Sequence, residues 1–366
     1  MEYRVKSIFG SYAEQLQVFV DTNLEKFKAP FFSKYFAMGT PQMGLTYATA
    51  IGRARIEAAA AVVAHGSEAP LLSRAGLEKL SGEVAAIKIK RKMDEQEYRN
   101  WMVFQAMNVS DAAKRDQIIS LIWGDVKAVT ESVSSRLDIM AAQALSTGSI
   151  KLNITTNKTG IIPGTIDLLV THKIASDDAF AHASTANRLW TAALFASCTP
   201  ITDIVYFTQN YWQTYGLMFE RILMTPEKWW IIQKATEVTT VFDGTPTLDN
   251  FNSFMQANQL PIIELVNVKA NVESDGVASA ATTWEDKKYI TFVPAGNLGV
   301  IHNALSIEQI SPVAGVNYAV ANNMLISKWS QTEPFGEFTR GEIAAFPGLE
   351  VADSMVIINT EHATVF

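Results

Sequence analysis

Cysteine is nearly absent from this chain of 366 residues, which has one, Cys198. A single cysteine excludes an internal disulfide framework and a zinc site built from several thiolates. Its neighbours Leu194, Phe195 and Ala196 are apolar. This setting predicts a small buried core residue, which is the usual state of a free cysteine.

Long hydrophobic runs are also missing. No stretch reaches the ~18 apolar residues that a membrane-spanning helix needs. The first ten residues, MEYRVKSIFG, lack the apolar segment of a signal peptide. We therefore expect no membrane partner, and a chain that is made and folds in a cytosol.

The chain has no excess of basic residues. Lysine and arginine number 30 against 37 aspartates and glutamates, which gives a net charge of −7. A protein that wraps nucleic acid through phosphate contacts needs the opposite balance. The charge remains compatible with a surface that faces DNA without adhering to it.

Motifs of catalysis and cofactor binding are missing as well. The sequence holds no Walker-type phosphate loop, no Gly-x-Gly-x-x-Gly fingerprint and no Gly-x-Ser-x-Gly motif. No histidine lies three or four residues from another, so no helical metal pair exists; the histidines are His65, His172, His182, His302 and His362. We expect no catalytic residue, no cofactor and no metal site.

What is present is the composition of a folded protein, with 48% hydrophobic and 18% charged residues. The length suits two domains, or one large discontinuous domain.

The rest of the chain is organised around one long stretch, from Ser110 to Gly148. Its apolar residues recur at steps of four and three, as on one face of an α-helix: Ile118, Ile122, Val126, Val129, Val133, Leu137, Met140 and Ala144. Ser110 is the predicted N-cap, and Gly148 is the predicted left-handed residue after the last turn. A helix of ~37 residues would be roughly 55 Å long.

Two interpretations of this helix stay open: a long surface helix of an ordinary α+β enzyme, or a spine that ties distant parts of one subunit together. Its apolar face is expected to pack on strands predicted at 149–156 and 161–170, which are amphipathic and need a cover. Thr130 is expected on the opposite face.

The segment from Gly66 to Trp101 carries a basic run, IKIKRKM at 87–93, followed by the acidic DEQEY. The run alternates with period two, as a half-buried strand does. With the preceding APLLSRAGLEKL it predicts a long two-stranded arm, which is marginal alone and makes sense if another subunit covers it. The alternatives are a solvated charged hairpin, and a nucleic-acid patch whose field the acidic neighbours largely cancel.

Further elements follow from periodicity and punctuation. We expect helices at 11–28, 177–197, 223–235 and 247–258, the third with Thr225 as N-cap and Pro226 in its first turn. Strands are expected in the IVYF piece of 202–216, at 262–272 and 287–296 joined as a hairpin, and at 354–362. At 45–64 the alanines favour helix while the β-branched and aromatic residues also permit strand, and the family resemblance given below is the reason to expect a strand there. From 297 onward we expect short strands and turns.

The end of the long helix, SRLDIMAAQALSTGSIKL at 135–152, resembles a segment of tailed-phage major capsid proteins of the lambda E type. In that family an arginine-bearing helix ends in such a run and passes into a strand. The matching residues are Arg136, Met140, Ala141, Ala142, Gln143, Ala144, Leu145, Thr147 and Gly148. The stretches FVPAGNLGVIHNAL at 292–305, KWSQTEP at 328–334 and AFPGLEVADSMVII at 345–358 are similar to later passages of the family.

The resemblance implies an α+β fold of the phage HK-ninety-seven type, with an N-terminal arm, an extended E-loop, a peripheral domain with the spine helix and a sheet, and an axial domain. Placed on this chain, the arm is 1–45 and the E-loop 66–103. The peripheral domain takes 46–65, 104–180 and a return at 325–345. The axial domain takes 181–324 and the final strand at 346–366.

The function that the resemblance implies is a major capsid protein that assembles as hexamers and pentamers into an icosahedral phage head around double-stranded DNA. Its partners would be copies of itself, portal and scaffold proteins and in some shells a decoration protein, and its place the virion. We expect the E-loop residues Arg74, Lys88, Lys90, Arg91 and Lys92 to contact acidic groups on adjacent subunits. The alternatives are the shell of an encapsulin-type bacterial nanocompartment and a soluble α+β enzyme.

Overall fold

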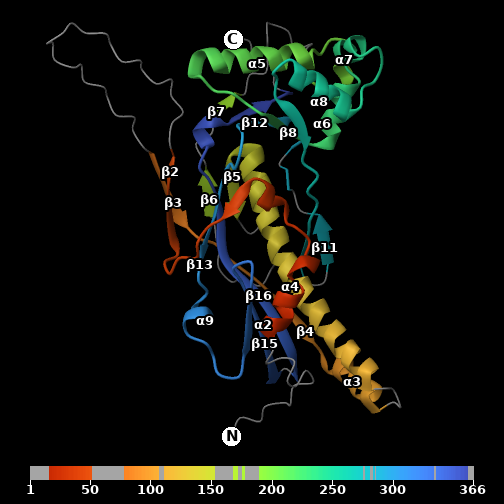
Figure 1. The fold of residues 1–366 in the computed structure, drawn as a ribbon, viewed down its shortest axis with the longest axis vertical. Coiled ribbons are helices and arrows are strands. Elements are labelled where there is room, and N and C mark those ends of the chain that lie inside the picture. The colour runs from red at the N-terminus through yellow and green to blue at the C-terminus, as the bar shows by residue number, and fades with distance from the viewer. Residues whose placement is uncertain are drawn as a thin grey trace, which may run out of the picture. The chain divides into compact units, whose positions relative to one another are not determined.

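The computed structural model describes residues 16–51, 78–106, 111–152, 168–171, 175–177, 189–274, 277–280, 283–284, 286–333 and 335–361. These residues contain no helix with the length and apolarity needed to cross a membrane. The chain divides into two compact units, each discontinuous in sequence. Unit 1 comprises Met1–Tyr47, Glu83–Asp138 and Ile301–Pro347, and unit 2 comprises the rest. Figure 1 labels their elements.

A six-stranded sheet forms the frame of unit 1. Five strands follow the order β1-β13-β16-β15-β14, and β4 pairs with β16 outside this path. The bounds are β1 Phe36–Met38, β4 Ala86–Met93, β13 Gly299–Ala304, β14 Asn317–Ala321, β15 Met324–Thr332 and β16 Phe335–Leu349. The 15-residue β16 is longer than the short strands expected after 297. It pairs with β15 along one side and with β4 along the other, antiparallel in both cases.

The predicted long helix is α4, Asp111–Thr147, with 37 residues. Gly148 follows it with a φ of 67°, and its N–H donates to the Ala144 carbonyl at 3.0 Å, so the predicted left-handed end is confirmed. The predicted apolar face is buried at every position from Ile122 to Ala144 whose side chain is described. The expected cap Ser110 lies outside the described residues.

The surface that α4 packs against differs from the prediction. Ile122 and Val126 belong to a core with Met93 of β4, Ala319 and Ala321 of β14, and Ile326 of β15. The cover of Ile122 and Val126 is therefore the sheet of unit 1, in which β14 and β15 come from segments far from α4 in sequence. The strands after α4 form a separate antiparallel pair, β5 Ser149–Leu152 with β6 Leu168–Thr171. Thr130 is only 2% exposed, so its assignment to an open opposite face was wrong.

The first described helix, α2, runs from Leu16 to Thr22 within the helix expected at 11–28, and ends earlier than predicted. Leu16 and Val20 are buried against α4 and β14. Gln17 completes the edge of β14: its amide donates to the Val320 carbonyl at 3.1 Å and accepts from the Val320 N–H at 2.7 Å. The helix thus satisfies backbone groups that an edge strand would otherwise leave open.

The expected arm is paired differently from the prediction. β3, Glu78–Glu83, pairs with β2, Thr46–Ile51, in a two-stranded ribbon, while β4 joins the sheet of unit 1. The two predicted arm strands are therefore not partners of each other. The strand interpretation of 45–64 holds for 46–51, and residues 52–77 lie outside the described residues.

The acidic DEQEY run begins helix α3, Glu95–Ala106. Asp94 accepts from the Glu97 N–H at 2.9 Å, and the Glu97 carboxylate accepts from the Asp94 N–H at 3.2 Å. This reciprocal pair is a capping box, which satisfies two N–H groups that the first turn leaves open.

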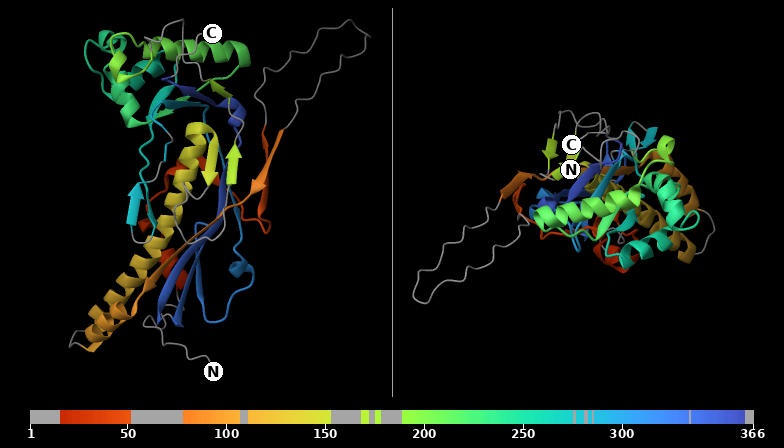
Figure 2. Two further views of the ribbon diagram at one scale, coloured as in Figure 1. Left: turned by 180° about the vertical axis from the view of Figure 1, so that it is seen from behind. Right: turned by 90° about the horizontal axis from the view of Figure 1, so that it is seen from above.

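Unit 2 is built on a five-stranded sheet in the order β7-β17-β12-β8-β9. The strands are β7 Ala175–Asp177, β8 Arg221–Met224, β9 Ile262–Leu265, β12 Tyr289–Val293 and β17 Val356–Asn359. Helices α5 Pro200–Tyr215, α6 Pro226–Gln233, α7 Thr236–Val241 and α8 Leu248–Ala257 share one apolar core with it. The views in Figures 1 and 2 show α6, α7 and α8 grouped near one end of α5.

Local signals predict the helices of unit 2 well where a cap is present. Thr225 caps α6, with its hydroxyl 3.4 Å from the Lys228 N–H, and Pro226 occupies the first turn. Thr247 caps α8, inside the helix expected at 247–258. The final strand β17 lies within the predicted 354–362.

Three predictions in unit 2 were wrong. The IVYF piece is helical, because Pro200 opens α5, Gly216 closes it with a φ of 70°, and Ile204 and Phe207 are buried at helical spacing. The helix expected at 177–197 is wrong for its described residues, 177 and 189–197, which hold the end of β7 and a short 3₁₀ turn at Ala192–Leu194. Residues 178–188 lie outside the described residues. Strands β9 and β12 do not form a hairpin, since β8 lies between them. The antiparallel pair in this part of the chain is instead β10, Asn271–Ser274, with β11, Val277–Ala280.

Candidate functional site

The basic strand β4 was the predicted contact element. Successive side chains of a strand point to opposite faces, so Lys88, Lys90 and Lys92 share one face of the sheet and Ile89 and Arg91 the other. Among the described strands β4 pairs with β16 alone, which makes it an edge strand. Lysines on an edge strand oppose uncontrolled pairing with another sheet.

On the helix side of the sheet, Asp125 of α4 binds two cations. Arg91 Nε lies 3.3 Å from Asp125 Oδ1, and Lys328 Nζ lies 4.0 Å from Asp125 Oδ2. Lys328 also donates to Thr339 Oγ at 2.9 Å. Burial lowers the pKa of Lys328, and burial raises the pKa of Asp125 against the opposing effect of Lys328 and Arg91. These contacts fix the helix to the sheet within one chain.

The opposite face of the sheet carries a second network of charges and rings. Lys88 Nζ lies 2.8 Å from Glu342 Oε1, directly across the strand pair. Arg340 lies 3.5 Å from Glu342 and 2.5 Å from Glu308. The stacked rings of Trp329 and Phe338, with centroids 5.4 Å apart, lie beneath two cations: the Arg340 guanidinium over Trp329 and Lys90 over Phe338.

The structure thus sorts the five predicted contact residues. Lys88 and Arg91 form ion pairs within their own chain. Lys90 and Lys92 are exposed on the outer face of β4, and neither has an ion pair among the described residues. Arg74 lies outside the described residues.

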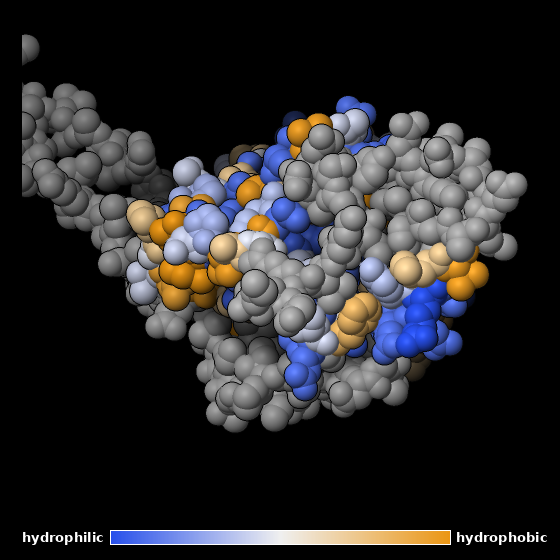
Figure 3. All heavy atoms as spheres, turned by 90° about the horizontal axis from the view of Figure 1, so that it is seen from below, coloured by the Kyte–Doolittle hydropathy of each residue, from blue (hydrophilic) through white to orange (hydrophobic). Residues whose placement is uncertain are grey.

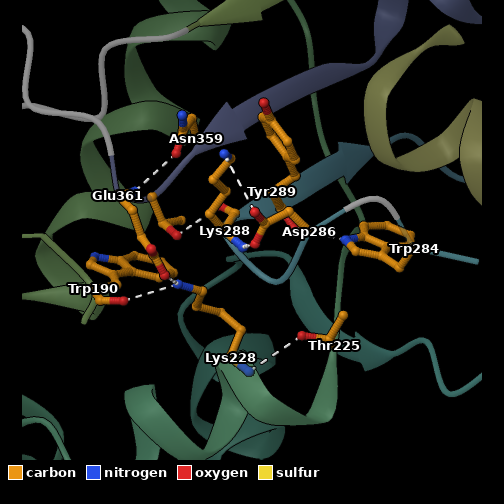
Figure 4. Close-up of polar contacts among 10 residues, drawn as sticks. Trp190, Thr225, Lys228, Trp284, Asp286, Lys288, Tyr289, Asn359 and Glu361 are labelled. Carbon is orange, nitrogen blue, oxygen red and sulfur yellow. Dashed lines mark hydrogen bonds and ion pairs between the residues drawn. The ribbon is translucent and has the colours of Figure 1, made fainter. Parts of the chain in front are cut away.

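A buried lysine that the sequence reasoning missed lies in unit 2 (Figure 4). Lys228 is 0% exposed, and its Nζ donates to the Trp190 carbonyl at 2.9 Å and to Glu361 Oε1 at 2.8 Å. Burial lowers its pKa, and Glu361 opposes that shift. The ion pair fixes Glu361, the second residue after the final strand, to the first turn of α6.

The environment of Lys228 continues through Trp190 to the start of α5. The Trp190 indole N–H donates to Asp203 Oδ2 at 3.0 Å, and Thr199 Oγ donates to Asp203 Oδ1 at 3.3 Å. Glu237 of α7 accepts from the Ile201 N–H at 2.8 Å, which caps the same helix. No local sequence signal marks Lys228 as buried, because its partners are 38 and 133 residues away.

The chemistry of these groups is that of structural contacts. Cys198 is buried as predicted, and burial raises the pKa of its thiol to about 11, so it stays protonated at neutral pH. A low thiol pKa would be needed for a nucleophile. Within the described ranges, no cluster of three His, Cys, Asp or Glu side chains could hold a metal ion.

The similarity of this chain to known proteins lies in its fold. No protein-family model and no curated protein matches the chain. Among solved structures, it is similar to a protein assigned as a capsid protein from a prophage of E. coli CFT073, with a TM-score of 0.56 at 14% identity over 95% of this chain and 98% of that chain. It is also similar to a phage-related protein of Bordetella bronchiseptica RB50, with a TM-score of 0.51 at 10% identity over 100% of both chains. The chain therefore has the α+β fold of phage capsid proteins, which confirms the expected fold class.

Proposed function

We propose that this chain is a major capsid protein, which self-assembles as hexamers and pentamers into an icosahedral phage head around double-stranded DNA. The observation that carries the proposal is the fold match along nearly the whole of both chains to the prophage protein assigned to a capsid. In this role the chain resides in the virion. Its partners are copies of itself, portal and scaffold proteins and, in some shells, a decoration protein.

The charge and contacts of the chain support a structural role. Two ion-pair networks join α4 to the sheet and tie that sheet's outer face together, while Lys228 anchors the end of the final strand. A net charge of −7 suits a shell that holds DNA without adhering to it.

The domain names belong to this proposal. We propose that four parts of the chain meet neighbouring subunits. They are the arm (1–45), the E-loop (66–103), the peripheral domain (46–65, 104–180 and 325–345) and the axial domain (181–324 and 346–366). For the E-loop we propose that Arg74, Lys90 and Lys92 contact acidic groups of adjacent subunits, and that Lys88 and Arg91 add contacts while keeping their own partners.

Sedimentation and cargo analysis of the full-length protein test the proposal. We expect large particles that protect double-stranded DNA from nuclease when they are isolated from an infected or induced host. Particles that hold folded protein and no genome would favour a nanocompartment shell. A small oligomer under all conditions of salt and concentration would favour a soluble enzyme and end the capsid proposal.

A further inference from the structure

Two sheet edges are each closed by the side-chain amide of a residue on a neighbouring helix. In unit 1, Gln17 of α2 donates to the Val320 carbonyl of β14 at 3.1 Å and accepts from the Val320 N–H at 2.7 Å. In unit 2, Asn252 of α8 donates to the Ile263 carbonyl of β9 at 2.8 Å and accepts from the Ile263 N–H at 2.8 Å. We call each of these two-point contacts an amide clamp.

Both clamps occupy the backbone groups that a further strand would use. β14 and β9 are the last strands in the order of their sheets. Val320 and Ile263 direct both their N–H and their C=O to the clamping amide, so these groups point away from the neighbouring strands β15 and β8. A side-chain amide carries a carbonyl acceptor and an NH₂ donor, so one residue completes both hydrogen bonds.

The two clamped strands are of the kind that pairs readily with a second strand. β14, Asn317–Ala321, has no charged residue. β9, Ile262–Leu265, has Glu264 alone, and that carboxylate lies 3.5 Å from Arg221 of the neighbouring β8. Edge strands of high β-propensity and low net charge are the ones that recruit strands from other chains.

The edge strand β4 is protected by charge instead. Lys88, Lys90 and Lys92 line one of its faces. In Figure 3, which is seen from below, hydrophilic side chains gather on the side where Figure 1 places α3, the helix that follows β4. Charge on an edge strand opposes pairing with another sheet. The amide clamps are therefore found on strands that lack this protection.

The clamping side chains are held in place by their own helices. Gln17 Nε2 also donates to Asp21 Oδ1, one turn along α2, at 2.8 Å. Leu16 beside it is buried in the core of unit 1, and Phe251 beside Asn252 is buried in the core of unit 2. A group of the same chain that is already in position competes with a second chain through its high effective concentration.

We propose that Gln17 and Asn252 close β14 and β9 to strand addition, and so keep this chain from aggregating through its sheet edges. The occupant that they exclude is an extended segment of another polypeptide that pairs with the edge through its backbone. The inference does not rest on the proposed shell function, because it concerns the unassembled chain.

Removing each amide at nearly constant size tests the clamps. Gln17→Met and Asn252→Leu should form aggregates that sediment and bind thioflavin T several times faster than the natural protein does, at a temperature well below the midpoint of unfolding. Thioflavin T binding distinguishes such aggregates from assembled shells. Gln256 of α8 is an exposed glutamine, so Gln256→Met is the matched control and should behave like the natural protein.

A second substitution separates an open edge from a loss of stability. Val320 is 39% exposed, so Val320→Lys places a charge on the β14 edge without restoring either hydrogen bond. Added to Gln17→Met, it should return the aggregation rate to near that of the natural protein. Added to Asn252→Leu, it should change nothing, because the charge then lies on a different sheet from the open edge.

The outcomes decide this inference separately from the proposed function. If Gln17→Met and Asn252→Leu aggregate no faster than Gln256→Met, the clamps do not block strand addition and the inference fails. If Val320→Lys leaves the aggregation of Gln17→Met unchanged, the aggregates do not form through the β14 edge, which also overturns it. A natural protein that never forms shells would end the capsid proposal, while the predicted aggregation of the two variants would still support the clamps.

Discussion

Gly341 of β16 lies directly against Val129 of α4, so close that a Cβ atom on the glycine would be 3.1 Å from both the Cβ and the carbonyl oxygen of Val129. This is shorter than the ~3.5 Å at which carbon atoms pack best. The long helix therefore approaches the sheet of unit 1 at a point where a side chain does not fit without a shift.

This close approach predicts opposite effects of two glycine substitutions. Gly341→Ala should lower the free energy of unfolding by about 1–3 kcal/mol, because helix and strand must move apart. Gly124 lies in α4 with nothing within 4 Å of an added Cβ, so Gly124→Ala should raise it by up to about 1 kcal/mol. Urea unfolding of unassembled protein measures both. Equal effects of the two changes would show that the helix does not approach the sheet at Gly341.

The buried face of α4 gives a second contrast. Leu137→Ala should cost about 2–5 kcal/mol and give protein that assembles poorly, because a core side chain is lost. Thr130 is buried, and its hydroxyl has no hydrogen-bond partner among the residues that the structure describes. Thr130→Val keeps the shape and removes that hydroxyl, so stability should hold or rise by about 1 kcal/mol. A lower free energy of unfolding for Thr130→Val would mean that the hydroxyl has a hydrogen-bond partner in solution.

The ion pair between Glu308 and Arg340 should make stability depend on acid pH. The hydrogen bond from Arg340 holds the pKa of Glu308 below its ordinary 4.5. A carboxylate with a lowered folded pKa contributes stability above pH ~4.5, and the contribution is lost as pH falls through the folded pKa. Glu308→Gln should remove this dependence. Asp125 and Asp138 have raised pKa values from burial and act with the opposite sign, so the difference between natural protein and variant isolates Glu308.

Unfolding measured from about pH 3 to about pH 6 checks this point. The difference in unfolding free energy between the two proteins should shrink as the pH falls. A constant difference would mean that Glu308 titrates as it does in the unfolded chain.

The buried Lys228–Glu361 pair predicts an asymmetry between its partners. Glu361→Ala leaves a buried ammonium group without its counter-charge and should cost about 3 kcal/mol or more. Lys228→Met should cost less, since the freed carboxylate is partly exposed and can be hydrated. Thermal unfolding of both variants shows which substitution lowers stability more. A larger loss from Lys228→Met than from Glu361→Ala would mean that Lys228 is more exposed to solvent than it is in the structure.

Features with a local cause were predictable from the sequence. Gly148 ends α4 and Thr225 and Thr247 cap their helices because each signal lies within a few residues of the element it controls. The apolar period of α4 identified its buried face. The apolar period could not identify the strands that this face packs against, since β14, β15 and β16 lie about 200 residues further along the chain.

The errors have the same physical origin. Ile204 and Phe207 favour strand by residue type, but Pro200 and burial at helical spacing place them in a helix. The apolar and basic residues of β4 alternate as in a strand, but its sequence gives no information that β16 is the strand it pairs with. Lys228 has the sequence context of a surface lysine, and only distant groups at Trp190 and Glu361 make its burial tolerable.

Electron cryomicroscopy of the purified protein shows whether many copies of this chain close into a shell. We expect closed icosahedral particles of hexamers and pentamers, in which each subunit has α4 against the sheet of β4, β14, β15 and β16. A protein that has this subunit fold but remains a monomer or a small closed oligomer at every concentration, salt and scaffold condition tested would contradict the capsid proposal.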